Sequence, residues 1–344
     1  MKYSNRLGVL SRDQFQAALA RFDLGELVHV EPVPFGNFGQ NVFLTSTKGK
    51  YVLRGAPHYP WQFPTEWFFV EQLHRKTRVP VPYPHLIEPS ADIFGWSFAI
   101  MPKLPGLLLA DKKIVSQLAL EDRLEIARAM ARMLAEAYTL SWEHAGEYDP
   151  EAGNVRPFDQ IYGEWVAKRI REKVALARSH NDHPTDSDVL WVESIIAHAR
   201  DAIHTPCESC VVLGDYGEHN AAVEHTPDGW RVCGVFDLMT AHVGNGNADL
   251  AMQAAVYLKE NPVLADESVR EYLRLRPAQP GFVERQQLYT LGLYASMWEY
   301  WQRDRGGPPE DKAVCLERWA KPFVEYWGGI IERIEQSGRY TCEL

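Results

Sequence analysis

The spacing of apolar residues changes near residue 102. Before that point the apolar runs are short and are separated by turn-forming residues, which predicts strands. Residues 65–75 differ, because apolar side chains recur there every three to four positions and predict a helix with Thr65 as its N-cap. A short helix capped by Ser11 is predicted at residues 11–24, and strands at 27–34, 40–46, 51–54, around 87 and at 94–101.

Beyond the Pro- and Gly-containing segment 102–106, apolar residues follow a helical spacing almost throughout. Only two strand-like runs, around residues 211–213 and 230–236, interrupt this part. The pattern predicts an α+β protein with a small β-rich N-lobe (1–101), a lobe connection (102–106) and a larger, mostly helical C-lobe (107–344). The helices predicted in the C-lobe cover residues 116–142, 158–179, 187–203, 248–259, 267–275, 282–304 and 310–335.

Composition supports a globular protein. The chain has 344 residues, 46% of them hydrophobic, which is enough for two lobes with a substantial core. No apolar run is long enough for a membrane span, and the N-terminus lacks the apolar core of a secretory signal, so we expect a cytoplasmic protein. Five scattered cysteines do not form a disulfide framework, and the lone pair Cys207 and Cys210 favours a reduced loop over a metal or redox site.

The net charge of −10 is unevenly distributed along the chain. Residues 1–103 carry a balance of +3, and the remainder carries −13. An acidic region of this kind repels phosphate backbones, which argues against nucleic acid as a partner. Two interpretations stay open: a solvated acidic surface, or a pocket that attracts a cationic small molecule.

Three polar residues follow the two strand-like runs of the C-lobe. Asp215 comes soon after an apolar pair at 211–212, Asn220 follows five residues later, and Asp237 ends the next apolar run. Each residue alone could belong to an ordinary turn. Together they have the types and order that phosphoryl transfer to a hydroxyl requires, with one carboxylate to orient the acceptor and an amide and a second carboxylate to hold Mg²⁺.

These motifs resemble the aminoglycoside phosphotransferase and choline-kinase-like family of small-molecule kinases. The family's His-Gly-Asp motif stands here as Leu213-Gly214-Asp215, with Asn220 in place and Asp249-Leu250-Ala251 further on. The resemblance covers roughly residues 27–260 and implies a two-lobed, protein-kinase-like fold. It also implies that Asp215 is the catalytic base, that Asn220 and Asp237 hold Mg²⁺, and that ATP or GTP is the phosphoryl donor.

In the N-lobe, the resemblance assigns residues to the nucleotide. Gly36 and Gly39 lie between two predicted strands, where backbone N–H groups can approach phosphates. Arg54 replaces the family's phosphate-binding Lys, and its expected partner is Glu66, with Glu71 as the competing candidate. The backbone from Met101 to Lys103, in the lobe connection, is expected to bind the purine.

The acceptor is less well specified. The aromatic-rich run 294–304 predicts mainly core packing. Because the family builds its acceptor pocket partly from C-terminal helices, the resemblance also makes four residues of this run, and one in the catalytic loop, substrate candidates. They are Trp298, Glu299, Trp301, Asp304 and Glu218.

The sequence therefore predicts a small-molecule kinase that moves the γ-phosphoryl group of ATP or GTP to a hydroxyl, with a cationic aminoglycoside or amino alcohol as the expected acceptor. The alternative is a catalytically silent protein on the same fold that binds nucleotide or metabolite, for which Leu213 and Arg54 are the best support. Antibiotic modification and a metabolic role are not distinguished, and no oligomeric state is predicted.

Overall fold

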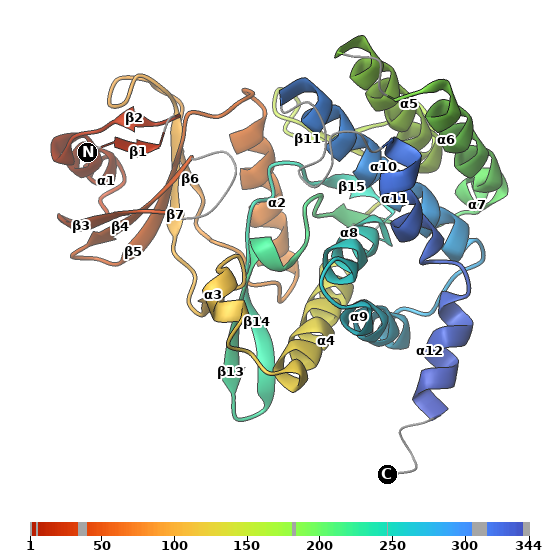
Figure 1. Ribbon diagram of the computed structural model, residues 1–344. Helices are drawn as coiled ribbons and strands as arrows, with labels where there is room; N and C mark the ends of the chain where they lie inside the picture. Colours follow the sequence, from red (N-terminus) through yellow and green to blue (C-terminus); the bar gives the residue numbers. More distant parts are fainter. Residues whose placement is uncertain are drawn as a thin grey trace. The chain divides into compact units, whose positions relative to one another are not determined.

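The computed structural model describes residues 2–4, 6–33, 40–180, 184–245, 247–304 and 315–339. The chain forms two compact units, one made of residues 1–140, 148–154 and 213–242, the other of residues 141–147, 155–212 and 243–344. Figure 1 labels most of their helices and strands. The first unit thus combines the β-rich N-terminal part with residues of the predicted C-lobe, and the predicted lobe boundary at 102–106 stays a prediction.

A five-stranded antiparallel sheet forms the N-terminal part of the first unit. Its order is β3-β4-β5-β7-β6, and every neighbouring pair is antiparallel. Side chains alternate between the faces of a strand, so Val42, Leu44 and Ser46 are buried on one face of β4. The strands are β3 (Leu27–Pro32), β4 (Asn41–Ser46), β5 (Lys50–Gly55), β6 (Leu86–Glu88) and β7 (Phe98–Pro102), and the short pair β1 (Lys2–Ser4) and β2 (Gly8–Val9) stands apart.

Two helices accompany this sheet. Helix α1 (Arg12–Arg21) begins after Ser11, whose hydroxyl accepts from the Gln14 N–H while the Gln14 side chain accepts from the Ser11 N–H, so the predicted N-cap is confirmed. Helix α2 (Gln62–Lys76) begins three residues before Thr65, and the predicted cap there is wrong. Pro64 lies in the first turn of α2, where a missing N–H leaves no bond unmade, so the helix includes it.

The first unit also contains a β-hairpin that the sequence only half predicted. Strands β13 (Ala221–Thr226) and β14 (Gly229–Val235) pair with each other, and β8 (Leu107–Leu108) adds to β13. The predicted helix 116–142 corresponds to the shorter α4 (Leu120–Ala137), and a separate short helix, α3 (Lys112–Val115), precedes it. The expectation of only two strands in this part is wrong, because strands of two to six residues give too few positions for a clear period.

The segment after β7 lies on this hairpin. Gly106 has φ of +95°, and a Cβ at this position would lie 2.3 Å from Cys233 Sγ and 2.7 Å from the Val223 carbonyl oxygen. Gly234 likewise leaves room for the Leu104 side chain. The Cys233 thiol donates to the Pro105 carbonyl at 3.1 Å. These contacts hold residues 104–106 close to β13 and β14.

The second unit is mostly helical and includes a sheet of short strands. Helix α10 packs along α5 and against α8 and α11. The predicted helix 310–335 is divided by Gly329, whose φ of +69° ends the helical path, and residues 310–314 lie outside the described part. No described helix is long and apolar enough to cross a membrane. The helices are α5 (Tyr162–His180), α6 (Asp186–His198), α7 (Arg200–His204), α8 (Asn247–Leu258), α9 (Pro262–Leu275), α10 (Phe282–Asp304), α11 (Leu316–Glu325) and α12 (Ile330–Arg339). The strands wholly in this unit are β9 (Ser141–Trp142) and β12 (Ser209–Val212), and β10 (Gly146–Asp149), β11 (Asn154–Pro157) and β15 (His242–Gly244) belong to it in part.

A buried ion pair lies in the first unit. Arg54 on β5 and Glu66 on α2 are 5% and 0% exposed, and Arg54 Nη1 lies 3.0 and 2.9 Å from the two Glu66 carboxylate oxygens. His85 is also buried, with its Nε2 3.8 Å from Glu66 Oε2 and no hydrogen bond at either ring nitrogen among the described residues. Burial, with the Arg54 charge acting in the same direction, lowers the pKa of His85 from 6.5 to about 3.

We expect Gly106→Ala to destabilise the first unit by about 3 kcal/mol or more, because it combines a left-handed backbone with a steric overlap. Gly95→Ala is the matched control, since Gly95 has φ of +82° and nothing within 4 Å of the added Cβ. The control should lose only about 1–2 kcal/mol. Urea unfolding measures the stability of both variants. Equal losses of stability in the two would contradict the tight packing around Gly106.

Acid should destabilise the protein partly through His85. Its pKa is lower in the folded state, so the unfolded state binds more protons below pH 6.5, and stability present above that pH is lost as the pH falls toward about 3. Between pH 6.5 and 4.5 this group should account for about 2.5 kcal/mol of the loss. The free energy of unfolding, measured across this window, should depend less on pH in His85→Gln than in wild type. The control is His29→Gln, at an exposed position on β3, which should follow the wild-type profile. An identical pH profile in wild type and His85→Gln would contradict the assignment.

Candidate active site

The predicted catalytic loop, residues 213–220, follows directly after β12. Gly214 has φ of +87°, and a Cβ there would lie 2.6 Å from Thr240 Oγ1, so only glycine fits without a shift. Tyr216 is buried and its hydroxyl donates to the Met130 carbonyl at 2.8 Å, which anchors the loop on α4. The Asp215 side chain, between these two fixed residues, is 41% exposed. It therefore faces solvent from a rigid support.

Asn220 holds this aspartate. Its Nδ2 donates to the Asp215 carbonyl at 2.9 Å and to Asp215 Oδ2 at 3.1 Å. The Asn220 carbonyl accepts from the Phe236 N–H at 3.1 Å, one residue before Asp237. The predicted trio Asp215, Asn220 and Asp237 is thus linked by hydrogen bonds through neighbouring backbone. Because Nδ2 makes the bonds to Asp215, the amide oxygen Oδ1 of Asn220 is the atom left for a cation.

His219 contacts the same carboxylate, which the sequence analysis did not predict. Its Nε2 lies 3.0 Å from Asp215 Oδ1. Burial acts to lower the pKa of His219, but the hydrogen bond and charge of Asp215, together with Asp237 and Glu218, outweigh it and raise this pKa. The influence of both Asp215 and Asp237 on one imidazole indicates that their carboxylates lie in the same part of the first unit.

Asp237 follows β14 in a left-handed backbone conformation, with φ of +68°. Such a conformation is uncommon in residues other than glycine and asparagine, and it is often found at functional sites. Asp237 Oδ1 lies 3.1 Å from Arg54 Nη1. The Asp237 side chain is 26% exposed, so its carboxylate both contacts the buried Arg54 guanidinium and remains accessible to solvent.

Arg54 connects the predicted phosphate and metal positions. Its Nη1 is shared between Glu66 and Asp237, and its Nε donates to Asn41 Oδ1 at 3.0 Å. Burial opposes the charged form, but the carboxylates of Asp237 and Glu66 outweigh it and raise the pKa of Arg54. Burial raises the pKa of Glu66, with the Arg54 charge acting against it. Glu71, the competing partner in the sequence analysis, instead pairs with Arg75.

Glu218, a predicted substrate residue, is 6% exposed. Its Oε2 lies 2.9 Å from Arg123 Nη2 on α4, and the Arg123 side chain is also buried. A carboxylate in this environment connects the catalytic loop to α4. The sequence could not predict that Arg123 is the partner of Glu218, because the two residues are 95 positions apart and no motif links them.

The predicted nucleotide residues are only partly described. Gly36 and Gly39 lie outside the described residues. The Lys103 N–H donates to the Lys50 carbonyl at 2.9 Å, so it is not the donor for a purine. Hydrogen-bonding groups alternate in direction along a strand, and the Pro102 carbonyl therefore faces away from β5. Strand β6 pairs only with residues 98–100 of β7 and does not cover that carbonyl.

The remaining predicted substrate residues lie on α10 in the second unit. Trp298 is 1% exposed and packs near Trp319, with 5.7 Å between ring centroids. Glu299 is 2% exposed and pairs with Lys173 at 3.0 Å and Arg303 at 3.2 Å. Trp301 is half-buried against Tyr300, and the Asp304 side chain lies outside the described residues. Trp298 and Glu299 thus occupy core positions within this unit.

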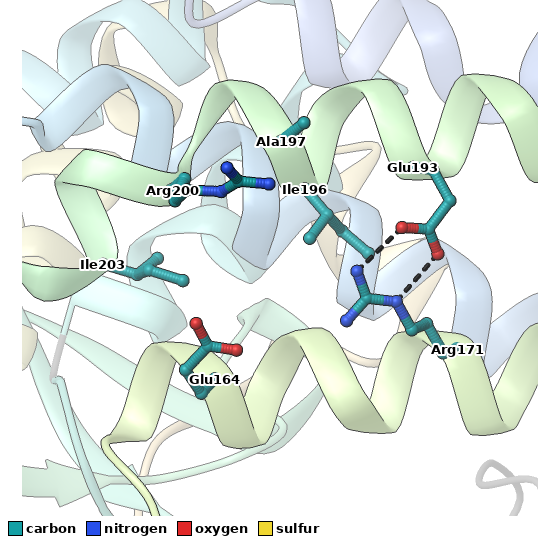
Figure 2. Close-up of a pocket in the computed structure, with 7 residues that line it drawn as sticks. All are labelled: Glu164, Arg171, Glu193, Ile196, Ala197, Arg200 and Ile203. Carbon is teal, nitrogen blue, oxygen red and sulfur yellow. Dashed lines mark hydrogen bonds and ion pairs between the residues drawn. The ribbon is translucent and has the colours of Figure 1, made fainter.

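A separate pocket lies in the second unit between α5, α6 and α7. Figure 2 shows the Arg171–Glu193 ion pair at one end and the Glu164 and Arg200 side chains at the other. None of the predicted site residues contributes to it. Its lining comprises Glu164, Arg171, Glu193, Ile196, Ala197, Arg200 and Ile203.

The donor set around Asp215 fits a hard cation bound by few protein ligands. The described residues contain no cluster of three or more His, Cys, Asp or Glu side chains suited to a metal. Mg²⁺ commonly takes one or two carboxylates, with water and phosphate oxygens completing its coordination. The Asn220 amide oxygen and the Asp237 carboxylate are oxygen ligands of this kind.

Comparison with solved structures identifies the fold. A thermostable mutant of an aminoglycoside phosphotransferase, solved as a ternary complex with ADP and hygromycin B, matches with a TM-score of 0.63 at 16% identity, over 91% of this chain and 98% of that one. The GDP complex of an aminoglycoside 2'-phosphotransferase matches with a TM-score of 0.61 at 14% identity, over 96% and 99%. Choline kinase from Streptococcus pneumoniae matches with a TM-score of 0.59 at 12% identity, over 91% and 98%. The chain therefore has the α+β, protein-kinase-like fold that the sequence predicted.

A search of curated proteins finds no match to the chain. The model of the phosphotransferase enzyme family, in contrast, matches residues 29–283, which is well over half of the sequence. This match includes most of β3, all of β4 to β7, the loop that carries Asp215, and Asp237. The chain belongs to the phosphotransferase enzyme family.

Proposed function

We propose that this protein transfers the γ-phosphoryl group of ATP or GTP to a hydroxyl of a small molecule. The observation that carries the proposal is the linked arrangement of Asp215, Asn220, Asp237 and Arg54. A solvent-facing carboxylate is fixed on a rigid loop, an amide oxygen and a second carboxylate lie next to it along hydrogen-bonded backbone, and a buried guanidinium contacts that second carboxylate. Phosphoryl transfer requires this set of groups.

Asp215 acts as the base in this scheme. Its carboxylate accepts a hydrogen bond from the acceptor hydroxyl and takes the proton as the hydroxyl oxygen forms a bond to the γ-phosphorus. The bond from that phosphorus to the bridging oxygen breaks, and the nucleoside diphosphate leaves with the electron pair. Because the loop is anchored through Tyr216 and Asn220, the carboxylate needs little reorganisation when the acceptor arrives.

Asn220 and Asp237 would hold Mg²⁺, which supplies charge neutralisation for the nucleotide phosphates. Arg54 holds the Asp237 carboxylate in place, and Glu66 restrains the guanidinium through the same nitrogen, Nη1. No described residue accepts a hydrogen bond from Arg54 Nη2, and this group is available to a phosphate oxygen. The backbone edge of β7 beyond its pairing with β6, at the Pro102 carbonyl, is the proposed contact for the purine.

For the acceptor we propose a hydroxylated cation, an aminoglycoside or an amino alcohol. The balance of −13 beyond residue 103 supports this class, because a negative potential concentrates cations. Two of the similar structures are of an aminoglycoside phosphotransferase and a choline kinase, which points the same way. Glu218 and Glu299 already form internal ion pairs, so they are less suited to bind the acceptor directly than the sequence suggested. We therefore expect other acidic residues beyond residue 103 to bind the acceptor.

A catalytically silent nucleotide-binding protein is the second candidate. Leu213 in place of the family's His favours it, yet the contacts of Asp215, Asn220 and Asp237 described above do not depend on a His at that position. Activity separates the two possibilities directly.

We expect a coupled assay for ADP or GDP release to find an acceptor among aminoglycosides, amino alcohols and neutral sugars, with cationic compounds preferred. Asp215→Asn should lower kcat by about 10²-fold or more and leave nucleotide affinity unchanged, because it removes the base and not a metal ligand. The measurement is steady-state kinetics with isothermal titration of nucleotide. Near wild-type turnover in this variant would overturn the role of Asp215, and a neutral or anionic best acceptor would overturn the cationic class alone.

Asp237→Asn should weaken Mg²⁺-nucleotide binding by about tenfold or more, because it removes the charged ligand and retains a side chain that tolerates the left-handed backbone. The readout is the rise in Tm produced by Mg²⁺-ATP or Mg²⁺-GTP, which should shrink relative to wild type. Asp92→Asn is the control, since Asp92 pairs with Arg21 at the surface of the same unit. An unchanged Tm response in Asp237→Asn, given a clear response of wild type, would place the cation elsewhere.

A further inference from the structure

We propose that His219 is a positioning residue that orients the Asp215 carboxylate to take the proton of the acceptor hydroxyl; this inference rests on the proposed function. His219 Nε2 lies 3.0 Å from Asp215 Oδ1, while Asn220 Nδ2 lies 3.1 Å from Asp215 Oδ2. Two neighbouring residues therefore hold the two oxygens of one carboxylate. Neither His219 nor its contact belongs to the motif that identified the loop.

The direction of the hydrogen bond follows from its chemistry. An ionised carboxylate can only accept, so His219 must present an N–H at Nε2. With one donor on each oxygen, rotation of the Asp215 carboxylate about its Cβ–Cγ bond is restrained. Each oxygen retains further lone-pair positions, and one of them can accept the hydroxyl of the acceptor. The pair of donors thus selects an orientation without occupying the whole carboxylate.

Local structure explains why residue 219 can reach back to residue 215. Residues Glu218–Asn220 form a short 3₁₀ turn (η1), closed by the Asn220 N–H donating to the Gly217 carbonyl at 3.0 Å. The buried Glu218–Arg123 pair anchors the first residue of this turn on α4. The turn therefore returns the chain toward the start of the loop and brings the imidazole to the carboxylate four residues earlier.

The residue at position 213 bears on how much the loop depends on the contact between His219 and Asp215. Leu213 is apolar and 1% exposed, so its side chain offers the loop no polar support. The polar contact to the catalytic carboxylate comes instead from the other end of the loop, where the His219 side chain is 40% exposed. A partly exposed side chain of this kind is not a core residue, and its hydrogen bond is to the Asp215 carboxylate, so we infer that its main effect is on Asp215.

The competing explanation is that His219 merely stabilises the folded loop. A matched pair of variants separates these roles, because a glutamine amide nitrogen can take the position of Nε2, whereas the shorter asparagine takes that of Nδ1. His219→Asn should lower kcat for the acceptor about 10–100-fold, since a misplaced base loses part of its 10²–10⁴-fold contribution, and His219→Gln should recover most of it. KM for Mg²⁺-nucleotide should not change in either variant, because His219 contacts the base and not the proposed metal ligands' free oxygens.

A double-mutant cycle completes the test. If His219 acts through Asp215, then His219→Asn should lower activity less than twofold further in an Asp215→Asn background. Multiplicative losses, or equal kcat in the Asn and Gln variants with lowered Tm in both, would overturn the inference. Full activity of His219→Asn beside an inactive Asp215→Asn would overturn it and leave the proposed function standing. A wild-type protein that phosphorylates no acceptor would overturn both.

Discussion

The buried guanidinium of Arg54 is the interaction on which the candidate site depends. One nitrogen, Nη1, contacts both oxygens of Glu66 and one oxygen of Asp237. A charge removed from water in this way requires well-placed partners, and losing one of them would leave the others uncompensated. The position of Asp237 is therefore coupled to the position of α2, because Glu66 belongs to that helix.

Backbone contacts extend this coupling to the catalytic loop. The Leu238 N–H donates to Glu66 Oε1 at 3.3 Å, and the Phe236 N–H donates to the Asn220 carbonyl at 3.1 Å. The two neighbours of Asp237 are therefore hydrogen-bonded: Leu238 to the Arg54–Glu66 ion pair, and Phe236 to the loop that carries Asp215. The chemistry expected of the site relies on this continuous chain of short contacts more than on any single residue.

Much of this arrangement could be predicted from the sequence. The order of Asp215, Asn220 and Asp237, and the choice of Glu66 as partner of Arg54, followed from spacing and family resemblance. The Arg54–Asp237 contact could not, because it joins residues 183 positions apart and neither periodicity nor motif spacing carries such information. Strand β13 was missed because its small residues, Ala221 and Ala222, give little strand signal. Burial of His85 and the return of His219 to Asp215 depend on tertiary packing and a short turn, which local patterns do not reveal.

The left-handed backbone at Asp237 also limits which residues evolution or design could place there. At φ of +68° a β-branched residue is excluded by sterics, and among acidic residues the short aspartate tolerates the conformation better than glutamate. Glycine would relieve the strain and remove the carboxylate, and asparagine would keep the shape and lose the charge. The backbone therefore narrows the choice to glycine, asparagine and aspartate, and of these three only aspartate offers the charged oxygen ligand that the proposed function requires.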